Sequence, residues 1–187
     1  ARSRHVQVGL SCVIMMWQHN IAFWEAAQLI LEIRKEGDPV LREKAAPVAV
    51  IDGEMRQLAA DMLETMYSAP GVGLAAPQVG ASVRLIVVDD GSGPHTLFNP
   101  VVISRRGEMC EEEGCLSVPG MLGRVKRAAQ VEVAAYDRSG RRIVVRGDDL
   151  LAIILQHETD HLDGVLFIDK AESLRRAADN KAESKGV

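Results

Sequence analysis

Residues 148–164 read DDLLAIILQHETDHLDG, an apolar run that ends in two histidines four positions apart. Leucines and isoleucines recur at helical spacing on the face that carries His157 and His161, and further leucines cover a second face. Asp148 is expected to cap this helix, and the Asp-Gly pair at 163–164 to end it. Because the segment is apolar nearly all round, we expect a buried helix at the centre of the fold.

The end of this helix forms an HExxH motif at 157–161. Residues four apart lie one above the other on a helix, so the imidazoles of His157 and His161 can bind one cation. Glu158, the residue after His157, would then lie beside the open coordination position of that ion. The motif alone predicts a metal-dependent hydrolase and lacks only a third ligand.

Cys115, in the run EEGCLS at 112–117, is the candidate for this third ligand. A free cysteine is usually a small buried hydrophobe. Here the HExxH motif needs a further ligand, and no other residue of the sequence is as clear a candidate. Two imidazoles and a thiolate would leave a tetrahedral metal one position for water, as a catalytic site requires.

The remaining periodicity predicts an α+β domain. An amphipathic helix is expected over 52–68 with Asp52 as its N-cap, and its methionine stripe is interpreted as core. Residues 170–185, with mixed charges and good helix formers, predict a C-terminal helix. Strands are expected at 30–33, 83–88 and 96–103, and a hairpin at 131–135 with 143–145.

Composition excludes several functional classes. The chain has 187 residues, 47% apolar content and a net charge of −4, which suits one domain with a full core. Basic residues are scattered rather than gathered, so we expect no nucleic-acid binding. Three cysteines, an odd number, fit a reducing compartment rather than a disulfide framework.

Residues 1–29 are interpreted as an atypical N-terminal extension, and 30–187 as a single catalytic domain. The extension contains both tryptophans and no acidic residue before Glu25, and it shares features with an organellar transit peptide and with a signal peptide but fits neither well. Its apolar stretch at 12–17 is too short for a transmembrane helix, and we expect no membrane contact. We expect a bacterial cytoplasmic protein, with the mitochondrial or plastid matrix as the alternative.

Three blocks carry a resemblance to a known family. GVGLAAPQ at 71–78, EGCLS at 113–117 and HETDH at 157–161 stand in the order and approximate spacing of the signature motifs of peptide deformylase. The resemblance runs from about Ile30 to about Asp169. It implies an α+β fold with mixed, mainly antiparallel sheets around a central metal-bearing helix and with a C-terminal helix. The implied reaction removes the formyl group from N-formylmethionine at the start of nascent polypeptides and releases formate.

The resemblance also implies roles for individual residues. Glu158 would act as general base and then as general acid. The oxyanion would be stabilised by the side-chain amide of Gln78 and by the backbone N–H of Leu116. Gly73 would let its main chain pair with an extended substrate. With Cys115, His157 and His161 as ligands, one divalent ion per chain is expected, Fe²⁺ first and Zn²⁺ next.

Hydrophobic residues beside the metal are expected to choose the substrate. Ile153 and Ile154 lie four and three positions before His157, so helical geometry projects them toward the same side. Val72, in the glycine-rich loop, resembles a third wall of the family's pocket. The three residues would receive the methionine side chain of a formylated peptide.

The expected partners are N-formylmethionyl nascent peptides, and we expect a monomer. Contact with the ribosome, which the resemblance implies for members with a basic C-terminal helix, is weakly supported because residues 170–185 are only weakly basic. Two alternative functions also fit the sequence. They are a general zincin peptidase, which would normally take a downstream third ligand, and a non-catalytic protein that binds peptides.

Overall fold

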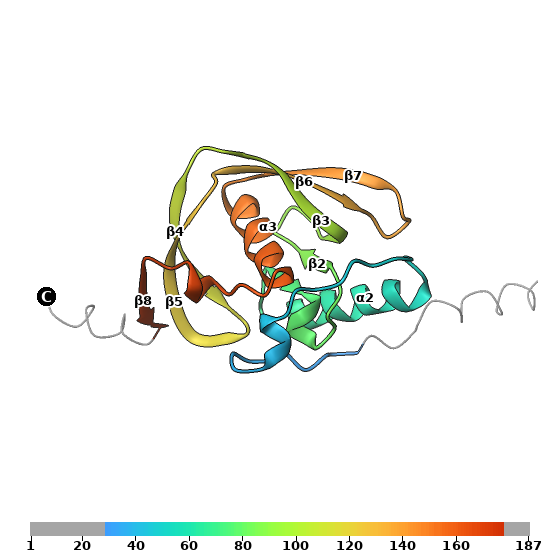
Figure 1. The fold of residues 1–187 in the computed structure, drawn as a ribbon, viewed down its shortest axis with the longest axis horizontal. Helices are drawn as coiled ribbons and strands as arrows, with labels where there is room; N and C mark the ends of the chain where they lie inside the picture. The colour runs from blue at the N-terminus through green and yellow to red at the C-terminus, as the bar shows by residue number, and fades with distance from the viewer. Residues whose placement is uncertain (1–28, 178–187) are drawn as a thin grey trace, which may run out of the picture.

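The computed structural model describes residues 29–177 (Figure 1). Nearly all of the expected N-terminal extension, with Trp17 and Trp24, lies outside this range. The last ten residues lie outside it as well. The described chain forms two antiparallel sheets with one helix between them and a second helix packed on one edge.

The larger sheet has five strands in the order β1-β2-β3-β6-β7, and every ladder in it is antiparallel. Its middle strands bury apolar side chains against the helices. β6 and β7 form the predicted hairpin, while β1 is an edge strand. The bounds are β1 (Gly73–Ala75), β2 (Leu85–Val88), β3 (His95–Arg106), β6 (Gln130–Tyr136) and β7 (Arg142–Asp148).

The smaller sheet has three strands in the order β4-β5-β8. Its strands are β4 (Met109–Cys115), β5 (Val118–Arg127) and β8 (Ser173–Arg176). A register shift between Gly114 and Cys115 tightens the β4–β5 turn, so that Cys115 pairs with Val118. This irregular turn brings the candidate cysteine to the end of the sheet that faces the central helix.

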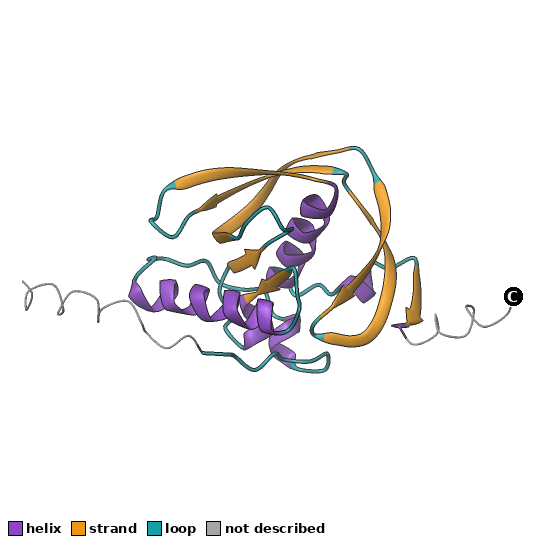
Figure 2. Ribbon diagram, turned by 180° about the vertical axis from the view of Figure 1, so that it is seen from behind, coloured by secondary structure: helices purple, strands orange, loops and turns teal. Residues whose placement is uncertain are grey.

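The central helix is α3 (Asp149–Leu162), and Figures 1 and 2 show it between the two sheets. The other long helix, α2 (Gly53–Ser68), packs on β1 and β2. Three short 3-10 helices complete the described chain: η1 (Pro39–Arg42), η2 (Ala76–Val79) and η3 (Phe167–Asp169). The predicted α+β class, with mainly antiparallel sheets around this helix, is confirmed.

Most of α3 is buried, as its sequence predicts. Leu151, Ile154 and Leu155 pack into a core shared with the inner face of the larger sheet. The expected cap is only partly correct, because Asp148 occupies the N-cap position but its side chain makes no capping hydrogen bond. For α2, by contrast, the Asp52 side chain accepts a hydrogen bond from the N–H of Met55 at 3.0 Å.

Two predicted elements are wrong. Residues 30–33 form no strand, because their backbone bonds to a helix side chain instead of to a strand: the N–H of Leu31 donates to Thr65 Oγ1 at 2.8 Å. The C-terminal helix is also wrong where the structure describes it, because Ser173–Arg176 pairs with β5 as β8. Pairing with a distant strand satisfies that backbone, and local helix propensity does not reveal it.

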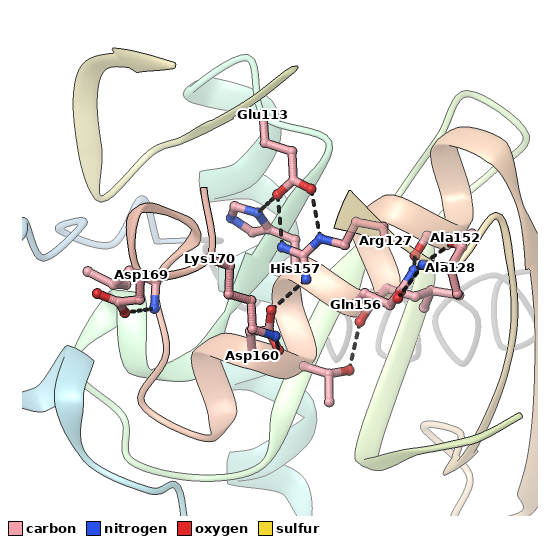
Figure 3. A network of polar contacts seen from close by, with 12 residues as sticks. Glu113, Arg127, Ala128, Ala152, Gln156, His157, Asp160, Asp169 and Lys170 are labelled. Atoms are coloured by element: carbon pink, nitrogen blue, oxygen red, sulfur yellow. Dashed lines mark hydrogen bonds and ion pairs between the residues drawn. The ribbon is translucent and has the colours of Figure 1, made fainter. Parts of the chain in front are cut away.

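The side chain of Gln156 connects α3 to the short loop between β5 and β6. Its Oε1 accepts from the N–H of Ala128 at 3.1 Å, and its Nε2 donates to the carbonyls of Ala128 at 3.0 Å and Ala152 at 2.8 Å (Figure 3). One buried amide therefore completes the hydrogen bonding of a loop that has no strand partner.

Replacing Gln156 by Met is expected to lower the free energy of unfolding by about 1–3 kcal/mol, because partly buried peptide groups lose their partner. Urea denaturation measures this change. Gln130→Met, on an exposed strand position, is the matched control and should stay within about 0.5 kcal/mol of the parent. Equal stabilities for the two variants would contradict the role given to Gln156.

Candidate metal centre and active site

The three expected ligands meet at one point. The ligand atoms of Cys115, His157 and His161 all lie within 4.8 Å of one another. Cys115 Sγ is 3.2 Å from His161 Nε2, and the two imidazole centroids are 5.0 Å apart. Both histidines are buried. Cys115, which lies 42 positions before His157, thus joins the two histidines in a site of one sulfur and two nitrogens, a donor set suited to zinc or ferrous iron.

The orientation of one imidazole and the protonation of the other fit metal binding. His157 Nδ1 lies 2.8 Å from Glu113 Oε2, so its N–H donates to this carboxylate and Nε2 is left as the ligand atom. Burial and the charge on His157 lower the pKa of His161 well below its ordinary value. The His161 ring is therefore neutral, and one of its two nitrogens carries a free lone pair.

The surroundings of His157 favour a positive charge. Burial opposes protonation of this ring, yet hydrogen bonds to Cys115 and Glu113 and the charge of Glu158 raise its pKa to about 10. Groups that stabilise a proton here would also stabilise a metal cation. The residues present therefore fit a bound divalent ion.

A buried network of ion pairs contacts His157 through Glu113 (Figure 3). Arg127 binds Glu113 with two hydrogen bonds, of 2.7 and 2.9 Å, and reaches Asp160 at 2.5 Å. Lys170 binds the other oxygen of Asp160 at 2.6 Å. Burial alone would raise the pKa of Glu113, but Arg127 and His157 lower it below its ordinary value. Glu113 is thus an anion that orients the histidine.

Glu158 is buried beside the ligands, and its Oε2 has no hydrogen-bond partner among the described residues. Burial, with a smaller contribution from Glu113, raises its pKa to about 7 although His157 acts in the opposite direction. A carboxylate poised near neutral pH can accept and return a proton. Glu158 also lines the cavity next to the candidate ligands.

Gly73 makes room for this carboxylate. A Cβ added to Gly73 would lie 2.8 Å from Glu158 Cδ, which is closer than real Cβ atoms approach. The sequence predicts that Gly73 exposes its backbone to substrate. The structure adds a steric reason for glycine that the sequence does not reveal.

Gln78 and Leu116 lie at the same centre. The Gln78 side chain is buried, its Oε1 accepts from the N–H of Ala75 at 2.8 Å, and its Nε2 donates to Ser117 Oγ at 3.1 Å. The same Nε2 is 3.5 Å from Cys115 Sγ. This amide is therefore oriented with its N–H groups toward the candidate ligand and toward the turn that contains Leu116.

A cavity of about 640 Å³ opens onto the centre. Val72, Ile153 and Ile154 all line it, as do Glu158 and the candidate ligands Cys115 and His157. Val72 is exposed and Ile153 half-buried, whereas Ile154 is 4% exposed and also belongs to the core. The sequence does not identify the walls from the smaller sheet and the first turn of α3: Met121, Leu122 and Leu150.

Sequence reasoning gives no role to Glu113, Arg127 or Asp160. Glu113 lies inside the EGCLS motif and Asp160 inside the HETDH motif, next to candidate ligands that are expected to be buried. A charged residue at such a buried position is the signal that could have identified them. Nothing local marks Arg127, which is one of many arginines. Only the pairing of β4 with β5 brings it to Glu113.

The fold and this site together define a metal-dependent hydrolase. A sequence model of the family described as polypeptide deformylase matches residues 30–177. The peptide deformylase of Desulfitobacterium hafniense is 52% identical over 147 residues, covering 79% of this chain and 98% of that protein. That of Symbiobacterium thermophilum is 53% identical over 157 residues, covering 82% and 72%.

Solved structures agree with this match. The crystal structure of the Thermotoga maritima peptide deformylase gives a TM-score of 0.75 at 40% identity and covers 77% of this chain and 99% of that one. The Synechococcus elongatus enzyme in complex with actinonin gives 0.75 at 46% identity, covering 79% and 83%. The chain belongs to the peptide deformylase family.

The reaction follows from the family. The chain is a metal-dependent hydrolase that removes the N-formyl group from N-formylmethionine at the start of nascent polypeptides. This activity replaces both the general zincin peptidase and the non-catalytic binding protein as interpretations of the HExxH motif. The relatives named above are bacterial, and no helix in residues 29–177 is long and apolar enough to cross a membrane.

Replacing Gly73 by Ala is expected to lower kcat at least ~10²-fold, because the new methyl group displaces the Glu158 carboxylate. The bound metal, measured per chain by elemental analysis, should stay at the parent value. Gly53→Ala is the matched control, since a Cβ there meets no atom within 4 Å. Parent activity in Gly73→Ala would show that Glu158 tolerates the displacement.

Proposed function

We propose that the chain carries out deformylation with one divalent metal ion held by Cys115, His157 and His161, and with Glu158 as the group that moves the proton. One observation carries this proposal. A buried carboxylate oxygen that has no hydrogen-bond partner within residues 29–177 belongs to a residue beside three converging ligand atoms, and this residue lines a cavity of about 640 Å³. A structural metal site would not need such a carboxylate.

The proposed ion is Fe²⁺, with Zn²⁺ next, because one thiolate and two imidazoles suit both ions and the family resemblance favours iron. When bound, such an ion acts as a Lewis acid that polarises the formyl oxygen and lowers the pKa of water toward ~7. The chain's own residues supply the proton transfer and stabilise the remaining charge.

Glu158 accepts a proton from the attacking water and later returns it to the nitrogen of the departing amine. The C–N bond of the formamide breaks, and formate and a free α-amine result. A carboxyl group with a pKa of about 7 suits both steps, because it is a competent base and a competent acid near neutral pH. Its burial keeps competing water away from the proton.

Gln78 and Leu116 are proposed to stabilise the negative charge that develops on the formyl oxygen. The Gln78 amide is already fixed by its bond from Ala75, so it loses little freedom when substrate binds. Leu116 follows Cys115 in a tight turn, which holds its backbone N–H next to the sulfur ligand.

The peptide substrate is proposed to bind as an added strand along β1. Gly73 lies in β1, and β1 is an edge of the five-stranded sheet, so one side of its backbone has no strand partner there. An extended peptide can form main-chain hydrogen bonds with such an edge. This arrangement would place the formyl group beside Glu158.

The substrate indicates where in the cell the enzyme acts. Formylated nascent chains are made by bacterial-type ribosomes, so we propose a cytoplasmic location and a monomeric enzyme that meets its substrates near the ribosome. Direct ribosome binding is not proposed, because residues 173–176 of the expected C-terminal helix form the strand β8. Residues 1–29 are proposed to be an extension outside the catalytic domain.

Protein purified without oxygen is expected to contain about one iron ion per chain. Cys115→Ala and His161→Ala should each lose most of it, because each removes one of three protein ligands. Cys110→Ala is the matched control for the first variant and should keep the metal. Glu158→Ala should also keep the metal but lose at least ~10²-fold in kcat. Unchanged metal content in Cys115→Ala would remove this cysteine from the ligand set.

Formyl-Met peptides are expected to exceed formyl-Gly peptides in kcat/KM by roughly 10- to 150-fold, because burying a methionine side chain contributes ~1.5–3 kcal/mol. Ile153→Asp should abolish most of this preference while the metal stays bound. Ile153 is chosen because Ile154 is buried in the core, where a carboxylate would destabilise the fold. Val50→Asp, at a position 67% exposed and outside the cavity, is the control. Equal turnover of both peptides by the parent would contradict the pocket.

A further inference from the structure

Residues 34–36 connect the two loops that carry the proposed oxyanion donors. The backbone N–H of Arg34 donates to the carbonyl of Gln78 at 2.7 Å. The backbone N–H of Glu36 donates to the carbonyl of Ser117 at 2.8 Å. This short segment, far from both loops in sequence, therefore sets the spacing between them.

Lys35 adds a side-chain contact between these two backbone bonds. Its Nζ donates to the carbonyl oxygen of Leu116 at 2.8 Å. The N–H of the same peptide unit, which belongs to Ser117, lies 3.4 Å from Cys115 Sγ and donates to it. A single peptide group thus joins the Lys35 ammonium at one end to the sulfur of a proposed metal ligand at the other.

This arrangement has two physical consequences. A cation on the carbonyl oxygen polarises the peptide group, so the opposite N–H becomes a stronger donor to sulfur. Hydrogen bonds to a ligand atom are one means by which proteins tune a bound metal. The contact also restrains the Leu116 carbonyl, and with it the backbone that presents the Leu116 N–H to the oxyanion.

We propose that Lys35 is a positioning residue for deformylation, acting through the Leu116–Ser117 peptide on the Cys115 sulfur and on the Leu116 N–H. The inference rests on the proposed roles of Cys115 and Leu116. It extends them to a residue eighty positions away that touches neither substrate nor metal. An exposed lysine with only a surface contact would influence neither reaction rate nor metal spectrum.

The test compares Lys35→Met, which keeps the chain length but removes the donor, with Lys35→Arg, which keeps a cationic donor. Lys44→Met is the matched control, because Lys44 is an exposed lysine nearby in sequence. Kinetics are measured on a formyl-Met peptide. The absorption spectrum is measured on protein loaded with Co²⁺, whose sulfur-to-cobalt charge-transfer band reports on hydrogen bonding to the thiolate.

In Lys35→Met, kcat is expected to fall roughly 3- to 10-fold, the effect of one net hydrogen bond, with KM near the parent value. The charge-transfer band should move to lower energy, because a sulfur with a weaker N–H donor gives up its electrons more readily. Lys35→Arg should recover most of both properties, and Lys44→Met should change neither.

Three results would each overturn the proposal: parent kcat in Lys35→Met, an unshifted cobalt band in that variant, or equal losses in Lys44→Met. Failure of the proposed function is recognised separately. If Cys115→Ala keeps its metal, the ligand assignment itself is wrong. If Cys115→Ala loses its metal while Lys35→Met behaves as the parent, only the inference about Lys35 fails.

Discussion

The fold depends on the burial of three ionisable side chains that lie in one five-residue stretch of α3. His157, Glu158 and His161 are each less than 10% exposed, and unpaired buried charge is strongly destabilising. A bound cation would satisfy both imidazoles at once, which relates metal binding to stability as well as to catalysis. Two sheets enclose α3 because an apolar helix with such residues cannot lie at the surface.

The compensation for this burial comes mainly from the smaller sheet. Glu113 on β4 and Arg127 on β5 form a buried ion pair with good geometry, and both face α3, where they contact His157 and Asp160. A buried pair of this kind contributes little net stability on its own. It fixes the ring of His157 and the orientation of the sheet relative to the helix, so catalytic geometry and sheet docking depend on the same contacts.

Close approach is the second constraint on the site. Gly73 leaves space for the Glu158 carboxylate, and the tight turn after Gly114 brings Cys115 to the histidines. Residues 34–36 then form hydrogen bonds with both the loop that contains Gln78 and the turn that contains Leu116 and Ser117. The candidate site is thus assembled from three separate segments around one helix, which lets the donors be oriented before substrate arrives.

The sequence by itself determined the central helix, its two histidines and glutamate and the class of the fold, because helical periodicity and the i, i+4 spacing of His157 and His161 are local properties of the chain. It also marked Cys115 as the candidate third ligand, and the structure places this cysteine beside both histidines. The sequence could not determine the partners of buried charges, the strand β8 or the route of residues 30–33. Arg127 meets Glu113 through side chains that reach across the paired strands β4 and β5, and Leu31 bonds to α2 rather than to a strand. Such pairings join residues far apart in sequence, and only tertiary packing selects among the backbone and charged groups that could form them.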